Sequence, residues 1–293
     1  MPTDLPAIIT GPLSPAQQTS LINIIRRAAR TEILPRFRRL SAGQIAAKTR
    51  PDDLVTEADT AAEAMIARGL ARMFPGATII GEEAAAADPS LRTRAAEAEL
   101  AFIIDPVDGT WNFAHGLGAF GVILAATRYG RPVFGLIYDP LADDYVIADE
   151  ASPARHVTAT GRETRLTMSG GGPIAKLSGY THASLMPKPV QRLLAPLLTE
   201  FARTDALRCS AHEYRMAAMG NVDFILSGTL NPWDHAAGVL ICQRAGGVAK
   251  MLDGADYTID REKGYLLTAA DPATWDAVAE VLDPLLTAPP VES

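Results

Sequence analysis

Apolar residues recur at intervals of three and four in two segments near the start of the chain, the spacing of an amphipathic helix. The first segment follows Ser14, a good N-cap residue with proline next to it, and should end or kink at Pro35. The second follows Thr56 and should run to about Met73. Asp59, three residues after Thr56, would complete a shortened capping box. Two long surface helices are therefore expected before residue 75.

Short apolar runs bounded by turn residues predict a sheet in the first half. Residues 78–80 should form a short buried strand that ends in paired glutamates. Another buried strand should include Ile103 and stop at Pro106, because proline cannot donate a ladder hydrogen bond. After it, Gly109 allows a sharp turn and Thr110 would cap the next element. Three further runs are typical of an antiparallel meander: 120–127, 132–138 and 145–148.

The second half is less regular. The polar segment 151–165 is interpreted as a junction between two layers of one domain or between two subdomains. The glycine-rich segment 168–173 is interpreted as a loop, since it lacks the lysine of a P-loop. Strands are predicted at 222–226 and 265–269. Helices are predicted at 190–202, after the segment 207–214 and up to Gly220, from Pro232 to about 246, and at 274–286. We expect a tail at 1–13 and a single domain at 14–290, with layer pairs at about 14–150 and 151–290.

Composition narrows the class of protein. A net charge of −7 argues against a nucleic-acid-binding surface, which is usually basic. The two cysteines cannot form a disulfide framework. No run of eighteen apolar residues predicts a membrane span, and the first residues lack the pattern of a signal peptide. A cytoplasmic protein that binds neither nucleic acid nor membrane is expected.

Acidic residues collect at the ends of the predicted elements. Six stand out: Asp59, Glu82, Glu83, Asp105, Asp108 and Asp234. Each has an ordinary alternative, namely a helix cap, a turn or a solvated loop. Together, oxygen ligands without a cluster of His or Cys favour Mg²⁺ over zinc, and paired hard cations suit phosphoryl hydrolysis.

The segments that carry these acids resemble the inositol monophosphatase family of lithium-sensitive, magnesium-dependent phosphatases. The resemblance rests on residues 53–59, 81–83, 105–113 and 233–238 followed by 245–247, and it extends from about 26 to 286. It implies a layered α/β/α/β/α sandwich of the α/β (α+β) class, with an antiparallel sheet in the first half and a mixed or parallel one in the second. It also implies a homodimer.

The resemblance assigns roles to individual residues. Glu82, Asp105 and the carbonyl of Val107 would hold one Mg²⁺, while Asp105, Asp108 and Asp234 would hold a second. Glu82 could also reach a third ion, and Glu83 would act behind the ligands or through water. Asp59 and Thr110 would orient and deprotonate the attacking water, and the N–H groups of Gly109 and Thr110 would hold phosphate. The role of Lys48 is left open.

The substrate half departs from the better-known inositol phosphatases. Cys209-Ser210-Ala211-His212 replaces their Gly-Ser/Thr-Ala-Ala, and Ser227 stands where they carry an acid for an inositol hydroxyl. Ser210, Ala211 and His212 should line the leaving-group pocket together with Asp108 and Asp234. His212 could bind a substrate hydroxyl or be a satisfied structural histidine. Glu213 could replace the missing acid.

The predicted function is a Mg²⁺-dependent phosphomonoesterase for inositol monophosphate or a similar small polyol phosphate. It would use two or three Mg²⁺ ions and direct attack by a metal-activated water. The alternative substrates are histidinol phosphate, fructose 1,6-bisphosphate and a 3′-phosphonucleotide. An alternative of another class is a non-catalytic regulatory or binding protein on the same fold.

Overall fold

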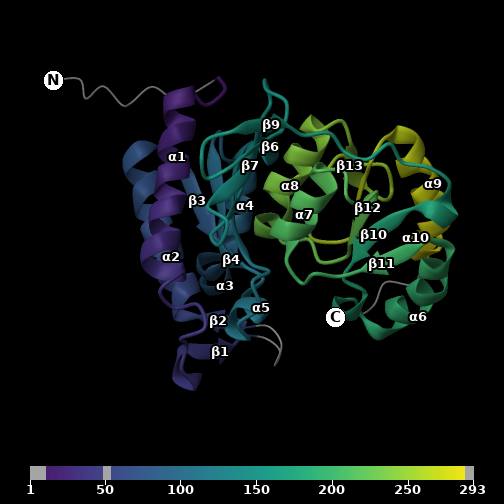
Figure 1. Cartoon of the computed structure of the whole chain (residues 1–293), viewed down its shortest axis with the longest axis horizontal. Coiled ribbons are helices and arrows are strands. Elements are labelled where there is room, and N and C mark those ends of the chain that lie inside the picture. Colours follow the sequence, from purple (N-terminus) through teal and green to yellow (C-terminus); the bar gives the residue numbers. More distant parts are fainter. Residues whose placement is uncertain (1–10, 49–53, 288–293) are drawn as a thin grey trace.

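The chain forms five layers in the order helix, sheet, helix, sheet, helix (Figure 1). The computed structural model describes residues 11–48 and 54–287. One outer layer is α1 (Pro15–Ala28) and α2 (Glu57–Met73), and the other is α6 (Lys188–Leu197), α9 (Pro272–Leu282) and α10 (Pro284–Thr287). Between the sheets lie α7 (Ser210–Ala218) and α8 (Pro232–Arg244). The predicted layered α/β sandwich is confirmed.

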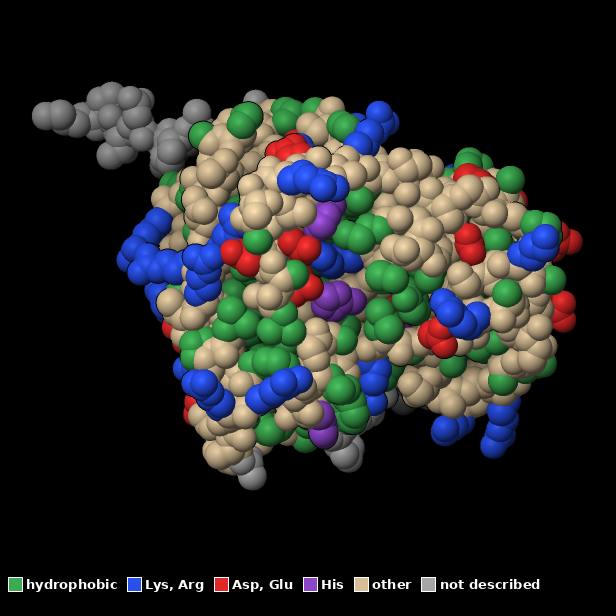
Figure 2. Space-filling view, in the orientation of Figure 1, with side chains coloured by type: hydrophobic (Ala, Val, Ile, Leu, Met, Phe, Trp, Pro, Cys, Tyr) green, Lys and Arg blue, Asp and Glu red, His purple; other side chains and the backbone are tan. Residues whose placement is uncertain are grey.

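Both predicted N-terminal helices are present. Ser14 caps α1 in a full capping box, and a π-helical turn, Ala29–Ile33, continues the helix almost to Pro35. Thr56 caps α2 with Asp59 as its partner, as predicted. The apolar faces of both helices pack on the first sheet, and basic side chains gather on the outer face over them (Figure 2).

Within the described residues, the first sheet has seven strands in sequential order. They are β3 (Thr78–Gly81), β4 (Ala101–Asp108), β5 (Gly121–Arg128), β6 (Arg131–Asp139), β7 (Asp144–Asp149), β8 (Arg155–Val157) and β9 (Glu163–Arg165). Only β3 and β4 pair in parallel, and the other pairs are antiparallel. Tyr129 and Gly130 join β5 to β6 with positive φ at both positions, the conformation that two-residue hairpins favour.

Three expectations for the first half were wrong. β4 does not stop at Pro106: its register passes from Asp105 opposite Ile123 to Asp108 opposite Gly121, so one extra residue on β4 makes room for the proline. Thr110 is the first residue of α5 (Thr110–Ala114) and not its cap, since Gly109 holds that position.

The third correction concerns segment 151–165. Instead of a junction between layers it supplies β8 and β9, so the first sheet reaches Arg165 rather than ending near residue 150. That residues 14–290 form a single domain stays a prediction. The predicted tail falls mainly on residues 1–10, which lie outside the described range, as do Asp53 and residues 288–290.

The second sheet is mixed, as the family resemblance implies. Its order is β11-β10-β12-β14-β13, with parallel pairs around β10 and antiparallel pairs around β14. Its strands are β10 (Ser178–Thr181), β11 (Arg203–Asp205), β12 (Phe224–Ser227), β13 (Val248–Met251) and β14 (Leu266–Ala269). Only β12 and β14 were predicted. Further short elements include β1 (Ile45–Ala47), β2 (Leu54–Thr56), α3 (Glu82–Ala87) and α4 (Ser90–Glu97).

Helix α8 is the central helix of the fold. Most of its residues are buried, because it contacts β6 of the first sheet on one side and β13 of the second on the other. A Cβ on Gly135 of β6 would lie 2.7 Å from the carbonyl oxygen of Ala237, so glycine allows the helix and the strand to approach closely. Among residues 11–48 and 54–287, no helix is long and apolar enough to cross a membrane.

Candidate active site

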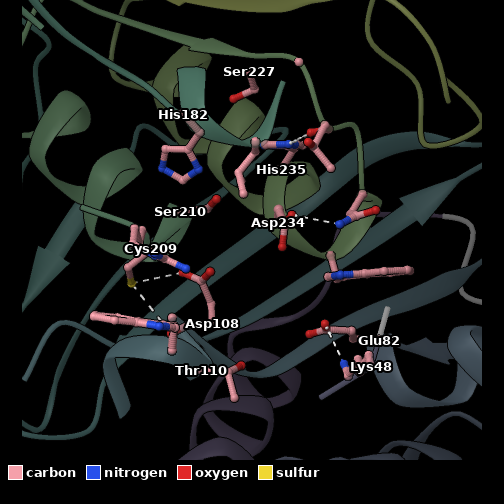
Figure 3. A pocket seen from close by; sticks show the side chains of 18 of the residues that line it. Lys48, Glu82, Asp108, Thr110, His182, Cys209, Ser210, Ser227, Asp234 and His235 are labelled. Carbon is pink, nitrogen blue, oxygen red and sulfur yellow. Dashed lines mark hydrogen bonds and ion pairs between the residues drawn. The ribbon is translucent and has the colours of Figure 1, made fainter. Parts of the chain in front are cut away.

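A cavity of about 860 Å³ is lined by residues from both halves of the chain. The first half contributes Lys48, Glu82, Asp108 and Thr110 to its wall. The second half contributes a larger set: His182, Cys209, Ser210, Ser227, Asp234 and His235. Figure 3 shows the carboxylates of Asp108, Asp234 and Glu82 facing the same space, with His182 and Ser227 on the opposite side from Thr110 and Lys48.

The end of β4 supplies two of the acids. The Asp105 carboxylate accepts a hydrogen bond from the Val107 N–H at 3.1 Å. The Asp108 carboxylate accepts from the Ala211 N–H at 2.5 Å and from the Cys209 thiol at 3.1 Å. Gly109 follows with φ of 85°, and a Cβ there would lie 2.7 Å from the Ala119 carbonyl oxygen. Glycine is therefore required where β4 turns into α5.

A third acid comes from the first turn of α8. Ligand oxygens of Asp105, Asp108 and Asp234 all lie within 4.8 Å of one another, a spacing at which they could hold a metal ion. Beside this helix start, the Asn231 amide donates a hydrogen bond to the Asp234 carboxylate at 3.2 Å. The structure thus brings together three of the predicted ligands from two distant segments.

Burial controls the charge of this group. It raises the pKa of Asp105 well above its ordinary value, and the Glu82, Asp108 and Asp234 carboxylates raise it further. Burial raises the pKa of Asp108 as well, although the hydrogen bonds from Ala211 and Cys209 oppose the rise. The pKa of Asp234 is raised to about 7, first by burial and then by Asp108. Three buried acids with raised pKa values need a positive charge between them to stay ionised together.

The paired glutamates lie at the start of α3, directly after β3. The Lys48 ammonium contacts Glu82 at 2.8 Å and Glu83 at 2.5 Å. Burial and the neighbouring Asp234 raise the pKa of Glu82 to about 8, although Lys48 opposes this. Burial alone would lower the pKa of Lys48, but the two glutamates raise it overall. Glu82 lines the cavity, but it is held by the lysine and lies outside the tight group of three acids.

Asp59 is fully buried at the first turn of α2. One carboxylate oxygen accepts from the N–H and the hydroxyl of Thr56, and the other lies 3.2 Å from the Thr110 hydroxyl. That hydroxyl also lies 2.9 Å from the Val107 carbonyl oxygen. Burial raises the pKa of Asp59 to about 6, against the hydrogen bonds from Thr56. The predicted helix cap and the approach to Thr110 therefore coexist in one side chain.

The other side of the cavity holds a histidine that sequence reasoning missed. The Nε2 atom of His182 lies 2.7 Å from a carboxylate oxygen of Glu213, and the same oxygen accepts from the Leu207 N–H at 2.6 Å. Burial would lower the pKa of His182, but the bond to Glu213 raises it overall. His182 and Glu213 are 31 residues apart, and no motif links them, so no local signal pointed to this pair.

Known proteins share this arrangement of elements. The family model described as "Inositol monophosphatase family" matches residues 16–285. The chain belongs to the inositol monophosphatase family.

Relatives within the family carry different names. A "Fructose-1,6-bisphosphatase/inositol-1-monophosphatase" of Thermotoga maritima is 29% identical over 211 residues, which is 71% of this chain and 75% of that protein. A "Nus factor SuhB" of Pseudomonas aeruginosa is 29% identical over 91% of this chain and 97% of its own length. The inositol monophosphatase II structure from Staphylococcus aureus has a TM-score of 0.76 at 22% identity, covering 93% of this chain and 97% of that one. The last likeness shows the fold alone.

The side of the cavity formed by the second half differs from what the sequence suggested. His212 does not line the cavity; its Nε2 atom lies 3.1 Å from the Phe120 carbonyl oxygen, which matches the structural alternative. Ala211 contributes its N–H to Asp108. Glu213 was considered as a replacement for the missing inositol-binding acid. Its carboxylate is hydrogen-bonded to His182 and to the Leu207 N–H. Ser210 and Ser227 do line the cavity.

Proposed function

We propose that this chain is a Mg²⁺-dependent phosphomonoesterase for small polyol phosphates, with inositol monophosphate as the first substrate to test. The observation that carries the proposal is the group of Asp105, Asp108 and Asp234, whose ligand oxygens lie within 4.8 Å of one another. Asp108 and Asp234 of this group line the cavity together with Thr110. A phosphatase needs a concentrated positive charge beside a nucleophile-activating group. These acids would hold that charge next to the Thr110–Asp59 contact.

The residues present fit a hard cation. The candidate donors are carboxylate and carbonyl oxygens, which Mg²⁺ prefers. Within the described part of the chain, Lys48 brings a cationic side chain to Glu82, whereas the group of three acids forms no ion pair. We propose Glu82, Asp105 and the Val107 carbonyl for one ion, and Asp105, Asp108 and Asp234 for another. When bound, Mg²⁺ would neutralise phosphate charge and lower the pKa of water.

The chain's own residues would supply the proton path. The Thr110 hydroxyl can take a proton from an attacking water while it passes its own proton to Asp59 across 3.2 Å. With a pKa of about 6, Asp59 is mainly ionised at pH 7 and yet basic enough to accept that proton. The N–H groups of Gly109 and Thr110, at the positive end of α5, would hold phosphate oxygens.

The leaving group would occupy the side of the cavity that carries His182, Ser210 and Ser227 (Figure 3). Because Nε2 of His182 is engaged by Glu213, Nδ1 is the ring nitrogen left for a substrate hydroxyl. The hydroxyls of Ser210 and Ser227 can donate or accept. This lining suits a polyol better than an apolar leaving group.

A substrate panel tests the proposal. Purified protein with Mg²⁺ should release phosphate from inositol 1-phosphate or glycerol 2-phosphate, and chelation should stop the release. Asp108→Asn should abolish turnover while circular dichroism stays unchanged. Magnesium-independent turnover, or turnover retained in the Asp108→Asn variant, would contradict the assigned metal role.

Two alternatives are tested by the same panel. The name of the Thermotoga relative favours including fructose 1,6-bisphosphate, and histidinol phosphate and a 3′-phosphonucleotide complete the set. The name of the Pseudomonas relative, Nus factor, favours a second candidate of another class, a regulatory binding protein. Absence of turnover across the whole panel would support the second candidate.

We also propose a homodimer, on the family resemblance alone. Light scattering of the purified protein at several concentrations measures the oligomeric state. A constant monomer mass would refute the dimer without affecting the proposed chemistry.

A further inference from the structure

Helix α2 carries two buried carboxylates on one face. Asp59 is fully buried and Glu63 is 8% exposed, and their spacing of four residues places both on the same side of the helix. Asp59 reaches Thr110 at the start of α5, directly after β4. Glu63 reaches a different segment, the turn from β3 into α3. One helix face therefore contacts both acidic segments of the first half.

The Glu63 carboxylate uses both of its oxygens on backbone groups of α3. One oxygen accepts from the Glu83 N–H at 2.9 Å, and the other accepts from the Ala84 N–H at 2.9 Å. The first N–H groups of a helix have no partner within it, and the cap residue of α3, Gly81, has no side chain to supply one. Glu63, 20 residues earlier in the chain, supplies the acceptors that a capping side chain would otherwise provide.

Gly81 supports the same interpretation. Its φ is −113°, a value open to any residue, so the backbone conformation does not explain the glycine. A Cβ at this position would lie 2.1 Å from Cδ and 2.2 Å from Oε2 of Glu63. Glycine is needed because the Glu63 carboxylate fills the space where a side chain would begin.

We propose that Glu63 is a positioning residue that sets the location of Glu82 relative to the other acids of the site. The inference rests on the proposed metal site and goes beyond it, because Glu63 neither lines the cavity nor serves as a ligand. It acts through the backbone of α3, which carries Glu82 and Glu83 toward Lys48. Without Glu63, the turn from β3 into α3 would have to become ordered each time a cation binds.

The test measures Mg²⁺ binding directly, by calorimetry on substrate-free protein. Glu63→Ala should raise the dissociation constant for Mg²⁺ about tenfold, the usual cost of losing a group behind a ligand. The kcat at saturating Mg²⁺ should change far less than the Mg²⁺ concentration needed for half-maximal rate. Glu63→Gln keeps one acceptor oxygen and should fall between. Glu57→Gln, an exposed acid on the same helix, is the matched control and should bind as the wild type does.

Gly81→Ala gives an independent arm that keeps Glu63. The new methyl group should displace the carboxylate and weaken Mg²⁺ binding as Glu63→Ala does. The double variant should bind no more weakly than Glu63→Ala alone, because the clash then has no partner. Additive losses in the double variant, or wild-type affinity in both Glu63 variants with circular dichroism unchanged, would overturn the positioning role.

The outcomes separate the two proposals. If wild-type protein binds no Mg²⁺, the proposed function and this inference both fail. If wild-type protein binds Mg²⁺ and releases phosphate while the Glu63 variants do the same at equal Mg²⁺ concentration, only the inference fails. If Mg²⁺ binds with the expected differences but no phosphate is released from the panel, the inference stands and the proposed activity fails.

Discussion

The two sides of the cavity are built in different ways. On the carboxylate side, Asp105 and Asp59 are fixed by groups within three residues of them, the Val107 N–H and Thr56, whereas Asp108 accepts from Cys209 and Ala211 of the second half. On the leaving-group side, His182 is fixed by Glu213, which lies on another element. The first kind of contact is local in sequence, and the second exists only after the second half has folded.

This difference has a functional consequence. The carboxylate side should keep its hydrogen bonds when His182 or Ser227 changes, because Asp108 is held from the second half by the Cys209 thiol and the Ala211 N–H. The wall formed by His182, Ser210 and Ser227 can then determine which phosphate ester enters. Single substitutions on either side, or away from both, should therefore differ in size and in substrate dependence.

Asp234→Asn should have the largest effect and reduce phosphate release by more than about a hundredfold, since even groups behind a metal ligand contribute 10–100-fold. The effect should be the same for every substrate in the panel, because the carboxylate side serves all of them. Since burial raises the pKa of Asp234 to about 7, its removal should leave the metal-free protein at least as stable. Initial rates and thermal melts measure both, and a substrate-dependent loss would contradict the separation.

Gly135→Ala should destabilise the protein by about 1–3 kcal/mol, the usual cost of overpacking. The added methyl group would press on the backbone of α8 at Ala237. Since α8 supplies Asp234, the Mg²⁺ requirement should rise as well. Urea unfolding measures the loss, and Gly76→Ala, where a Cβ meets nothing within 4 Å, is the control. Equal stability of both variants would show that α8 adjusts freely.

His182→Gln should act on one side only. The kcat/KM for glycerol 2-phosphate should fall about tenfold, the value of one hydrogen bond to a hydroxyl. The kcat/KM for isopropyl phosphate, which lacks both hydroxyls, should stay nearly constant. His156→Gln is the matched control, because its Nε2 atom also lies on a carboxylate, that of Asp144 at 2.8 Å. An equal fall in kcat/KM for both esters would show that His182 does not bind the substrate hydroxyls and instead maintains the structure of the site.

Asp143→Asn should have the smallest effect and should leave both sides of the cavity unchanged. Partial burial would raise the pKa of Asp143, but hydrogen bonds from Tyr138, Arg26 and Arg30 lower it overall. The carboxylate therefore stabilises the fold above its ordinary value of 3.8, and this contribution is lost as the pH falls through its lower folded-state pKa. Because these contacts are partly exposed, the loss should stay below about 1 kcal/mol.

The measurement is the difference in melting temperature between wild type and the Asp143→Asn variant. That difference should shrink as the pH falls from about 6 toward about 3, the range around the ordinary aspartate pKa. A difference that grows on acidification would reverse the assigned sign of the pKa shift.

The features that the sequence revealed show the same division. The cap at Thr56, the ends of α2 and the meander from β5 to β7 depend on residues close together in the chain, and these were predicted. The prediction that β4 stops at Pro106 was wrong, because a bulge in the pairing with β5 lets the strand continue through the proline. Short edge strands such as β9 and β11 carry little apolar signal of their own and were missed.

The same reasoning explains which site residues could be found. Asp105, Asp108 and Asp234 lie in segments with strong motifs, and the structure brings them together. His182 was not found because only its contact with Glu213 marks it, and His212 was considered instead because it stands close to Ser210 in the chain. Glu63 resembles an ordinary helix residue until the fold places α3 against it.

The lysine bridge at the start of α3 has a consequence for the enzyme before metal arrives. Lys48 already delivers one positive charge to Glu82 and Glu83, on a long and flexible side chain. We expect this tethered ammonium to act as a placeholder that keeps the acidic turn folded in low magnesium and swings aside when a divalent ion competes for Glu82. Binding of the divalent ion at Glu82 would then replace one cation by another, and the carboxylates would never be left without a positive charge beside them.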